Sequence, residues 1–156
     1  MVLSRQISRV LPYTAEQLFD LAADVERYPE FLQWWIKVRV RNRADDVYYT
    51  DQVLGIGPIH VEFRSKTVQC RPQRIDVTAN EAPFRKFRLS WLFDPQGAGH
   101  CRATLTAELE FRSFLIERLA DKAVSAGLND IVDSFVRRAH RLYASSGRPA
   151  GPDSNT

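Results

Sequence analysis

The chain has 156 residues and a formal net charge of +3, and this length fits a single domain. Its 44% hydrophobic and 26% charged residues are typical of a globular protein, and no apolar run approaches the ~18 residues of a membrane-spanning helix. A disordered chain and a helical membrane protein are therefore excluded, and two cysteines exclude a disulfide-dense secreted scaffold. The opening residues lack the apolar centre of a secretory signal, so we expect a cytoplasmic protein.

The first elements are predicted from short local signals. Residues 3–10 mix β-branched and polar side chains, which favours a strand. Thr14 and Gln17 have the spacing of a capping box, which predicts a helix over 15–23. A second short helix follows, and Pro29 shortens or bends it.

From residue 34 the hydrophobic period changes from helical to alternating, which predicts a series of strands. One face of the first of these strands is apolar and consists of Trp34, Ile36, Val38 and Val40. The other face is basic and consists of Trp35, Lys37, Arg39, Arg41 and Arg43. Further strands are predicted over 47–54, 59–71, 74–80, 85–93 and 101–111.

A long helical pattern without internal proline begins at Ser113 and extends to about Ala144. Short turns between successive strands favour an antiparallel sheet, and only this helix is long enough to cover the buried face. The predicted fold is therefore α+β, a curved antiparallel sheet around one C-terminal helix in a domain spanning 1–144. Residues 145–156 are polar and rich in Gly and Pro, which predicts a disordered tail.

Familiar catalytic motifs are not found in the sequence. It has no glycine-rich phosphate loop and no Cys-x-x-Cys pair, and His60, His100 and His140 lack metal-ligand spacing. Cys70 and Cys101 fall in predicted strands without an electropositive activating setting. We therefore expect no metal, no cofactor and no enzymatic activity.

Many large apolar residues fall on the faces assigned to the interior. Such residues either fill a core or line an apolar ligand cavity, and the sequence alone does not separate the two. The candidate lining residues are Trp34, Val38, Val53, Phe63, Val77, Phe87, Leu89, Trp91, Leu105, Ala107, Leu119, Leu128, Ile131 and Phe135.

Six segments, in order within 3–143, carry a family resemblance. They are LPYT with QLFDL (11–21), DVERYPEF (24–31), FRKF (84–87), WLFDP (91–95), EFRSFL (110–115) and FVRRA (135–139). These segments resemble the coenzyme Q-binding proteins, START-like relatives of the polyketide cyclase/dehydrase group. The resemblance implies a helix-grip fold with seven antiparallel strands, two short helices after the first strand and an apolar tunnel. It also implies a non-catalytic carrier of ubiquinone or a related isoprenoid lipid that supports respiration or quinone biosynthesis.

A quinone carrier must meet the membrane in which the quinone resides. Trp35 shares its predicted strand face with Lys37, Arg39 and Arg41. A tryptophan beside basic residues suits an anionic bilayer surface, and the same pattern also fits a solvated outer sheet face.

Two other functions stay open at this point. A sibling branch of the same family consists of ribosome-association toxins, and the basic strand together with Arg137, Arg138 and Arg141 could contact rRNA phosphates. A cyclase or aromatase would need a polar residue deep in the cavity, and residue spacing does not identify one.

Overall fold

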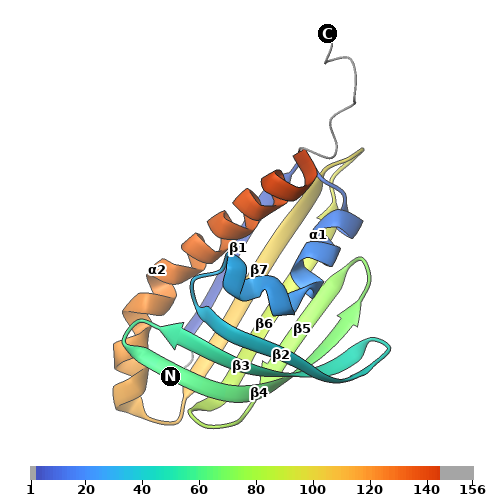
Figure 1. Cartoon of the computed structure of the whole chain (residues 1–156). Helices are drawn as coiled ribbons and strands as arrows, with labels where there is room; N and C mark the ends of the chain where they lie inside the picture. Colours follow the sequence, from blue (N-terminus) through green and yellow to red (C-terminus); the bar gives the residue numbers. More distant parts are fainter. Residues whose placement is uncertain (1–2, 145–156) are drawn as a thin grey trace.

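The computed structural model describes residues 3–144, and the predicted tail over 145–156 lies outside them. Seven strands form one antiparallel sheet in the order β1-β7-β6-β5-β4-β3-β2, and the long helix α2 covers one face of this sheet (Figure 1). The elements are β1 (Leu3–Leu11), α1 (Ala15–Ala23), η1 (Val25–Glu30), β2 (Trp35–Ala44), β3 (Val47–Ile56), β4 (Ile59–Cys70), β5 (Arg74–Ala79), β6 (Phe84–Pro95), β7 (Cys101–Phe111), α2 (Phe114–Ala139) and η2 (His140–Ala144). The predicted fold class and element order are confirmed.

Helix α1 begins where its cap was predicted. The Gln17 backbone N–H donates to Thr14 Oγ1 over 3.1 Å, and the Thr14 backbone N–H donates to Gln17 Oε1 over 3.0 Å. This reciprocal pair satisfies two backbone donors that the helix leaves unpaired. The 3-10 helix η1 follows directly and contains Pro29, so the second short helix is also present.

Strand β2 contains a bulge that reverses its inward and outward positions. Trp35 pairs with Leu54 and Lys37 pairs with Val53, so two steps along β2 match one step along β3. Trp35 therefore lies on the inner face and is 6% exposed, whereas Ile36 points outward and is 48% exposed. The prediction that Trp35 lies on the basic face is wrong, because strict alternation does not continue through the bulge.

Helix α2 turns one face toward the sheet. Its buried side chains are Ala120, Val124, Leu128, Ile131, Val132, Ser134, Phe135, Ala139 and Glu117. The indole of Trp34 lies against the helix at Gly127, where an added Cβ would come within 2.6 Å of Trp34 Nε1. The glycine thus lets the Trp34 ring approach the helix backbone.

Gly127→Ala is expected to lower the free energy of unfolding by about 1–2 kcal/mol, because the new methyl group overlaps the Trp34 ring. At an unobstructed site within a helix the same change stabilises by about 1 kcal/mol. Urea denaturation of both proteins measures the difference. The double variant Gly127→Ala/Trp34→Phe is expected to recover part of the loss, and a single variant more stable than the parent would contradict this account.

Candidate functional site

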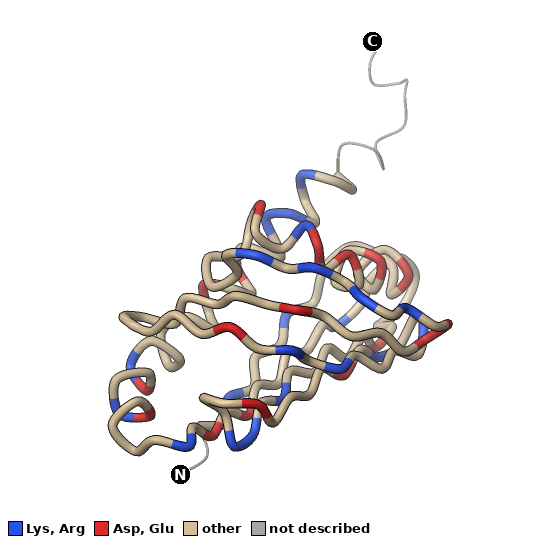
Figure 2. Tube along the Cα trace, turned by 60° about the horizontal axis from the view of Figure 1, so that its bottom comes forward, with Lys and Arg blue, Asp and Glu red and all other residues tan. Residues whose placement is uncertain are grey.

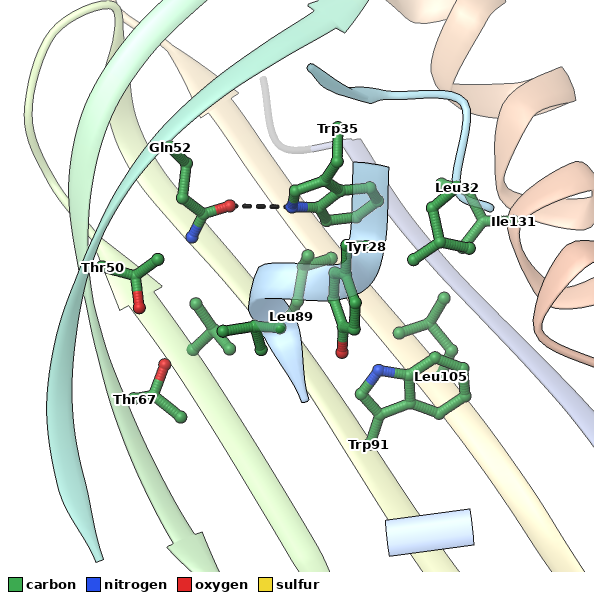
Figure 3. Close-up of a pocket in the computed structure, with 12 residues that line it drawn as sticks. Tyr28, Leu32, Trp35, Thr50, Gln52, Thr67, Leu89, Trp91, Leu105 and Ile131 are labelled. Atoms are coloured by element: carbon green, nitrogen blue, oxygen red, sulfur yellow. Dashed lines mark hydrogen bonds between the residues drawn. The ribbon is translucent and has the colours of Figure 1, made fainter. Parts of the chain in front are cut away.

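A cavity of about 30 Å³ lies between the sheet, η1 and α2 (Figure 3). Its lining residues are Val25, Tyr28, Leu32, Trp35, Thr50, Gln52, Thr67, Val77, Leu89, Trp91, Leu105 and Ile131. This volume holds roughly one or two water molecules. The open tunnel that the family resemblance implies is therefore not present in this conformation, and a larger ligand enters only after lining side chains move.

Five of the fourteen predicted lining residues contribute to this cavity. They are Val77, Leu89, Trp91, Leu105 and Ile131. All five belong to the central strands and to α2, where the alternating and helical patterns of the sequence are regular. Together they form the apolar wall of the cavity.

Seven other predicted residues lie elsewhere in or beside the core. Phe63 and Phe87 join Phe84 and Phe111 in an aromatic cluster with ring centroids 4.8–5.0 Å apart. Phe135 stacks on the far side of the wall, with its centroid 4.4 Å from that of Trp91. The remaining four are Trp34, against α2, the buried Ala107 and Leu128, and the half-buried Val38.

Two predicted lining residues point away from the interior. The inner face of β3 carries the even-numbered residues from Tyr48 to Ile56, so Val53 belongs to the outer face. Leu119 lies on the outer side of α2 and is 50% exposed. Both predictions are wrong because each followed the apolar character of the residue rather than its position in the repeat.

The wall opposite the apolar residues is a buried polar stripe that the sequence reading missed. Strands β3 and β4 turn Thr50, Gln52, Ser65 and Thr67 inward, and each is at most 5% exposed. The Trp35 Nε1–H donates to Gln52 Oε1 over 2.9 Å, and Gln52 Nε2 donates to Ser65 Oγ over 2.6 Å. This network orders the amide of Gln52 at the edge of the cavity (Figure 3).

The hydroxyl of Thr50 takes no part in this hydrogen-bond network. Thr50 Oγ1 is buried and has no hydrogen-bond partner within residues 3–144. Leaving a buried hydroxyl unpaired costs about 1–3 kcal/mol. The cavity thus contains a polar group that a bound oxygen atom would satisfy.

Tyr28 closes the cavity from the side of η1. Its hydroxyl donates to the carbonyl oxygen of Ala22, and its ring meets that of Trp35 edge-on with centroids 5.3 Å apart. Burial raises the pKa of Tyr28 well above its ordinary value, and the nearby Tyr48 raises it further. The phenol is therefore neutral, and none of the described lining residues carries an ionised side chain.

The basic side chains predicted for membrane or RNA contact lie on the outer face of β2. Lys37, Arg39 and Arg41 are exposed, and Lys and Arg recur along this strand (Figure 2). Arg41 is paired with Asp51, which also accepts a bond from Arg64 Nε over 2.9 Å. Hydrogen bonds from Arg64 and Arg41 hold the pKa of Asp51 below its ordinary value. Part of this basic surface is therefore neutralised by its own sheet.

The second basic cluster lies near the end of α2. Arg138 Nη2 donates to Glu30 Oε1 over 2.8 Å, and its guanidinium lies 4.9 Å from the centroid of the Phe31 ring. Arg137 donates to Ser134 Oγ over 2.9 Å. The two Arg138 contacts hold η1 and the following loop against α2, whereas the Arg137 bond lies within the helix.

Among residues 3–144, no helix has the length and apolarity to cross a bilayer. The same residues contain no group of three or more His, Cys, Asp or Glu side chains that could hold a metal ion.

Comparison with known proteins places this fold. The family of polyketide cyclase/dehydrase and lipid transport proteins matches residues 11–136. The ribosome association toxin RatA of Pseudomonas aeruginosa is 30% identical over 138 residues, which cover 88% of this chain and 96% of the toxin. The mitochondrial coenzyme Q-binding protein COQ10 of Dictyostelium discoideum is 27% identical over 154 residues, which cover 93% of this chain and 73% of that protein.

A START superfamily protein from Mycobacterium smegmatis has a similar structure, with a TM-score of 0.77 at 14% identity, over 89% of this chain and 98% of its own. At this identity the likeness concerns the fold alone. The family match, in contrast, spans most of the chain and includes every strand of the cavity. The protein therefore belongs to the polyketide cyclase/dehydrase and lipid transport family and has a START-like helix-grip fold.

Proposed function

We propose that the protein binds ubiquinone or a related isoprenoid lipid in the cavity between sheet and helix, and that it does so without catalysing a reaction. The observation that carries this proposal is the pairing of an apolar wall with a buried polar stripe that holds one unpartnered hydroxyl. A quinone has the same division, since its ring carries carbonyl oxygens and its tail is entirely apolar. The similarity to a coenzyme Q-binding protein supports the same ligand class.

The polar stripe sets the orientation of the ligand. A ring carbonyl oxygen accepts a hydrogen bond from Thr50 Oγ1, while the ring and the first tail carbons lie against Trp91, Leu105 and Ile131. Burial of the tail contributes roughly 25 cal/mol per Å² of apolar surface before the costs of binding. Because the described lining residues include no carboxyl, imidazole or amine group, we assign the cavity a binding role.

Movement of η1 gives the ligand room. This element and the loop after it supply Val25, Tyr28 and Leu32 to the lining. At the surface they are held by polar contacts: Glu26 Oε2 accepts from the Val40 backbone N–H over 2.9 Å, and Glu30 accepts from Arg138. Beneath these contacts, the side chains of Val25, Tyr28 and Leu32 are buried in the core. Exposed polar contacts of this kind contribute about 1 kcal/mol or less each, so the main cost of moving η1 is the exposure of these three buried side chains. An apolar ligand that packs against them offsets this cost.

Organic extraction of the purified protein followed by mass spectrometry is expected to release a quinone or another isoprenoid lipid. The protein stripped of lipid is expected to bind a short-tailed ubiquinone saturably, with quenching of Trp35 and Trp91 fluorescence because both indoles line the cavity. An isoprenoid hydrocarbon of equal length without ring oxygens serves as the control and should bind at least tenfold more weakly. An empty extract together with no saturable quenching would refute the proposal.

A second candidate function rests on the 30% identity to the RatA toxin, which extends over nearly the whole of that protein. In this case the chain would associate with a ribosomal subunit through exposed basic residues such as Lys37 and Arg39. Such binding weakens steeply with salt, whereas occupancy of an apolar cavity does not. Sucrose-gradient analysis of ribosomes with the parent protein and with Lys37→Gln/Arg39→Gln at two salt concentrations distinguishes the two functions.

A further inference from the structure

The outer face of α2 is unexpectedly apolar in its first two turns. Phe114 is 71% exposed, Leu115 is 67% exposed and Leu119 is 50% exposed. A helix that covers a sheet normally turns polar side chains to water on this side. Farther along, the same face carries Ser125, Ala126 and Asn129, so the apolar surface is confined to the start of the helix.

Basic residues lie among these apolar ones. At 100° per residue, Arg118 and Lys122 fall on the same face as Phe114, Leu115 and Leu119, which together span less than half of the helix circumference. The Arg118 guanidinium lies 5.8 Å from the centroid of the Phe114 ring. We call these five residues the outer α2 patch.

The exposed charges around the outer α2 patch have one sign. On the opposite face of the helix Glu117 is buried, and Asp121 is half-buried between the two faces. Arg5 of β1 extends toward the helix from the neighbouring strand and donates to Ser125 Oγ over 2.6 Å. The exposed charged residues within 112–126 are Arg112, Arg118 and Lys122, and all three are basic.

We propose that the outer α2 patch inserts into the surface of a bilayer that contains anionic phospholipids. Large apolar side chains interspersed with Arg and Lys on one helix face are typical of helices that lie at a membrane interface. The apolar side chains enter the boundary between headgroups and acyl chains, and the basic ones meet lipid phosphates. This inference rests on the proposed function, because a carrier of a membrane lipid must contact the bilayer to load or deliver it.

The size of the outer α2 patch argues against a second copy of the chain as its occupant. Three side chains of this kind cover roughly 500 Å² at most, and a stable dimer buries about 800 Å² on each partner. Insertion into a bilayer requires no minimum contact area, because each apolar side chain that leaves water contributes its own favourable free energy. The one-signed charge also repels an identical face and attracts an anionic lipid surface.

The test is flotation of the full chain with vesicles of phosphatidylglycerol and phosphatidylcholine, and with vesicles of phosphatidylcholine alone. The parent protein is expected to float with the anionic vesicles, and Phe114→Ser/Leu115→Ser/Leu119→Ser is expected to lose at least tenfold in partitioning. Arg118→Gln/Lys122→Gln should bind the anionic vesicles more weakly than the parent at low salt and about equally at high salt, because salt screens the attraction of these two charges. In Leu115→Trp, the fluorescence of the new indole should shift to the blue on anionic vesicles, because the indole leaves water. The three native indoles are already buried, so the shift reports on the new one.

The matched control removes three exposed apolar side chains at other sites, namely Val10, Val68 and Leu92. Val10→Ser/Val68→Ser/Leu92→Ser should float like the parent. Equal flotation of patch and control variants would overturn the proposal, as would a parent dimer that the patch variant loses. Quinone binding in detergent should be unchanged in the patch variant, so failure at the membrane and failure of the cavity give different results.

Discussion

Replacement of Thr50 by valine is expected to stabilise the protein and weaken its ligand binding at the same time. The Thr50 hydroxyl is buried without a partner, so removing it raises the free energy of unfolding by about 1 kcal/mol. The same hydroxyl is the donor to a quinone carbonyl in the proposed complex, so affinity for a short-tailed ubiquinone should fall about tenfold, or 1.4 kcal/mol. Urea denaturation and tryptophan quenching measure the two effects on one sample.

Ser65→Ala is the informative control, because Ser65 lies in the same stripe and is already bonded. Its hydroxyl accepts from Gln52 Nε2, so the alanine variant leaves that amide unpaired and should lose about 1–3 kcal/mol of stability. If Thr50→Val raises the free energy of unfolding and Ser65→Ala lowers it, the Thr50 hydroxyl serves a ligand rather than the fold. Destabilisation by Thr50→Val with full ligand affinity would assign the hydroxyl a structural role.

The local signals of the sequence were sufficient for the order of the elements. The capping box at Thr14 and Gln17, the alternation over 101–111 and the long helical period after Ser113 each depend on near neighbours in the chain. Such signals show which side of a segment is buried and which is exposed to water, so they predict single helices and strands well. They also place the apolar wall, because Leu89, Trp91 and Leu105 lie in regular central strands.

The side of β2 that faces inward could not be read in the same way. The bulge at Ile36 exists only in the pairing with β3, where Trp35 and Lys37 meet the neighbours Leu54 and Val53. A pattern in one strand does not report an irregularity in its register with another. The consequence reaches the site, since it moves Trp35 from the basic surface to the edge of the cavity.

The polar stripe was missed for a different reason. In the segment 47–56 both alternating sets contain apolar residues, so hydrophobicity does not decide which set is buried. Val53 was predicted to face the cavity because apolar side chains usually point inward, whereas the protein buries Thr50 and Gln52. Polar residues at inward positions break the pattern where a site requires them, and functional sites are where such exceptions are expected.

Trp91→Ala is expected to have the largest effect on stability, a loss of about 3–5 kcal/mol in the free energy of unfolding. The buried Trp91 indole stacks with the ring of Phe135, at 4.4 Å between centroids, and with that of Phe93, at 5.9 Å. Its removal takes away these contacts and joins the vacated space to the existing cavity. Leu92→Ala is the control, because Leu92 follows directly in β6 but lies on the outer face and is half-exposed.

The loss should be partly reversible by a small ligand. Free indole has the shape of the deleted side chain, and at one hundred times its dissociation constant a ligand restores about 2.7 kcal/mol. Thermal denaturation with and without indole should therefore show a rise in melting temperature for Trp91→Ala and none for Leu92→Ala. If indole leaves Trp91→Ala unchanged, the surrounding side chains have collapsed into the space. The apolar wall would then not persist without its tryptophan, and a quinone ring would find no preformed surface to lie against.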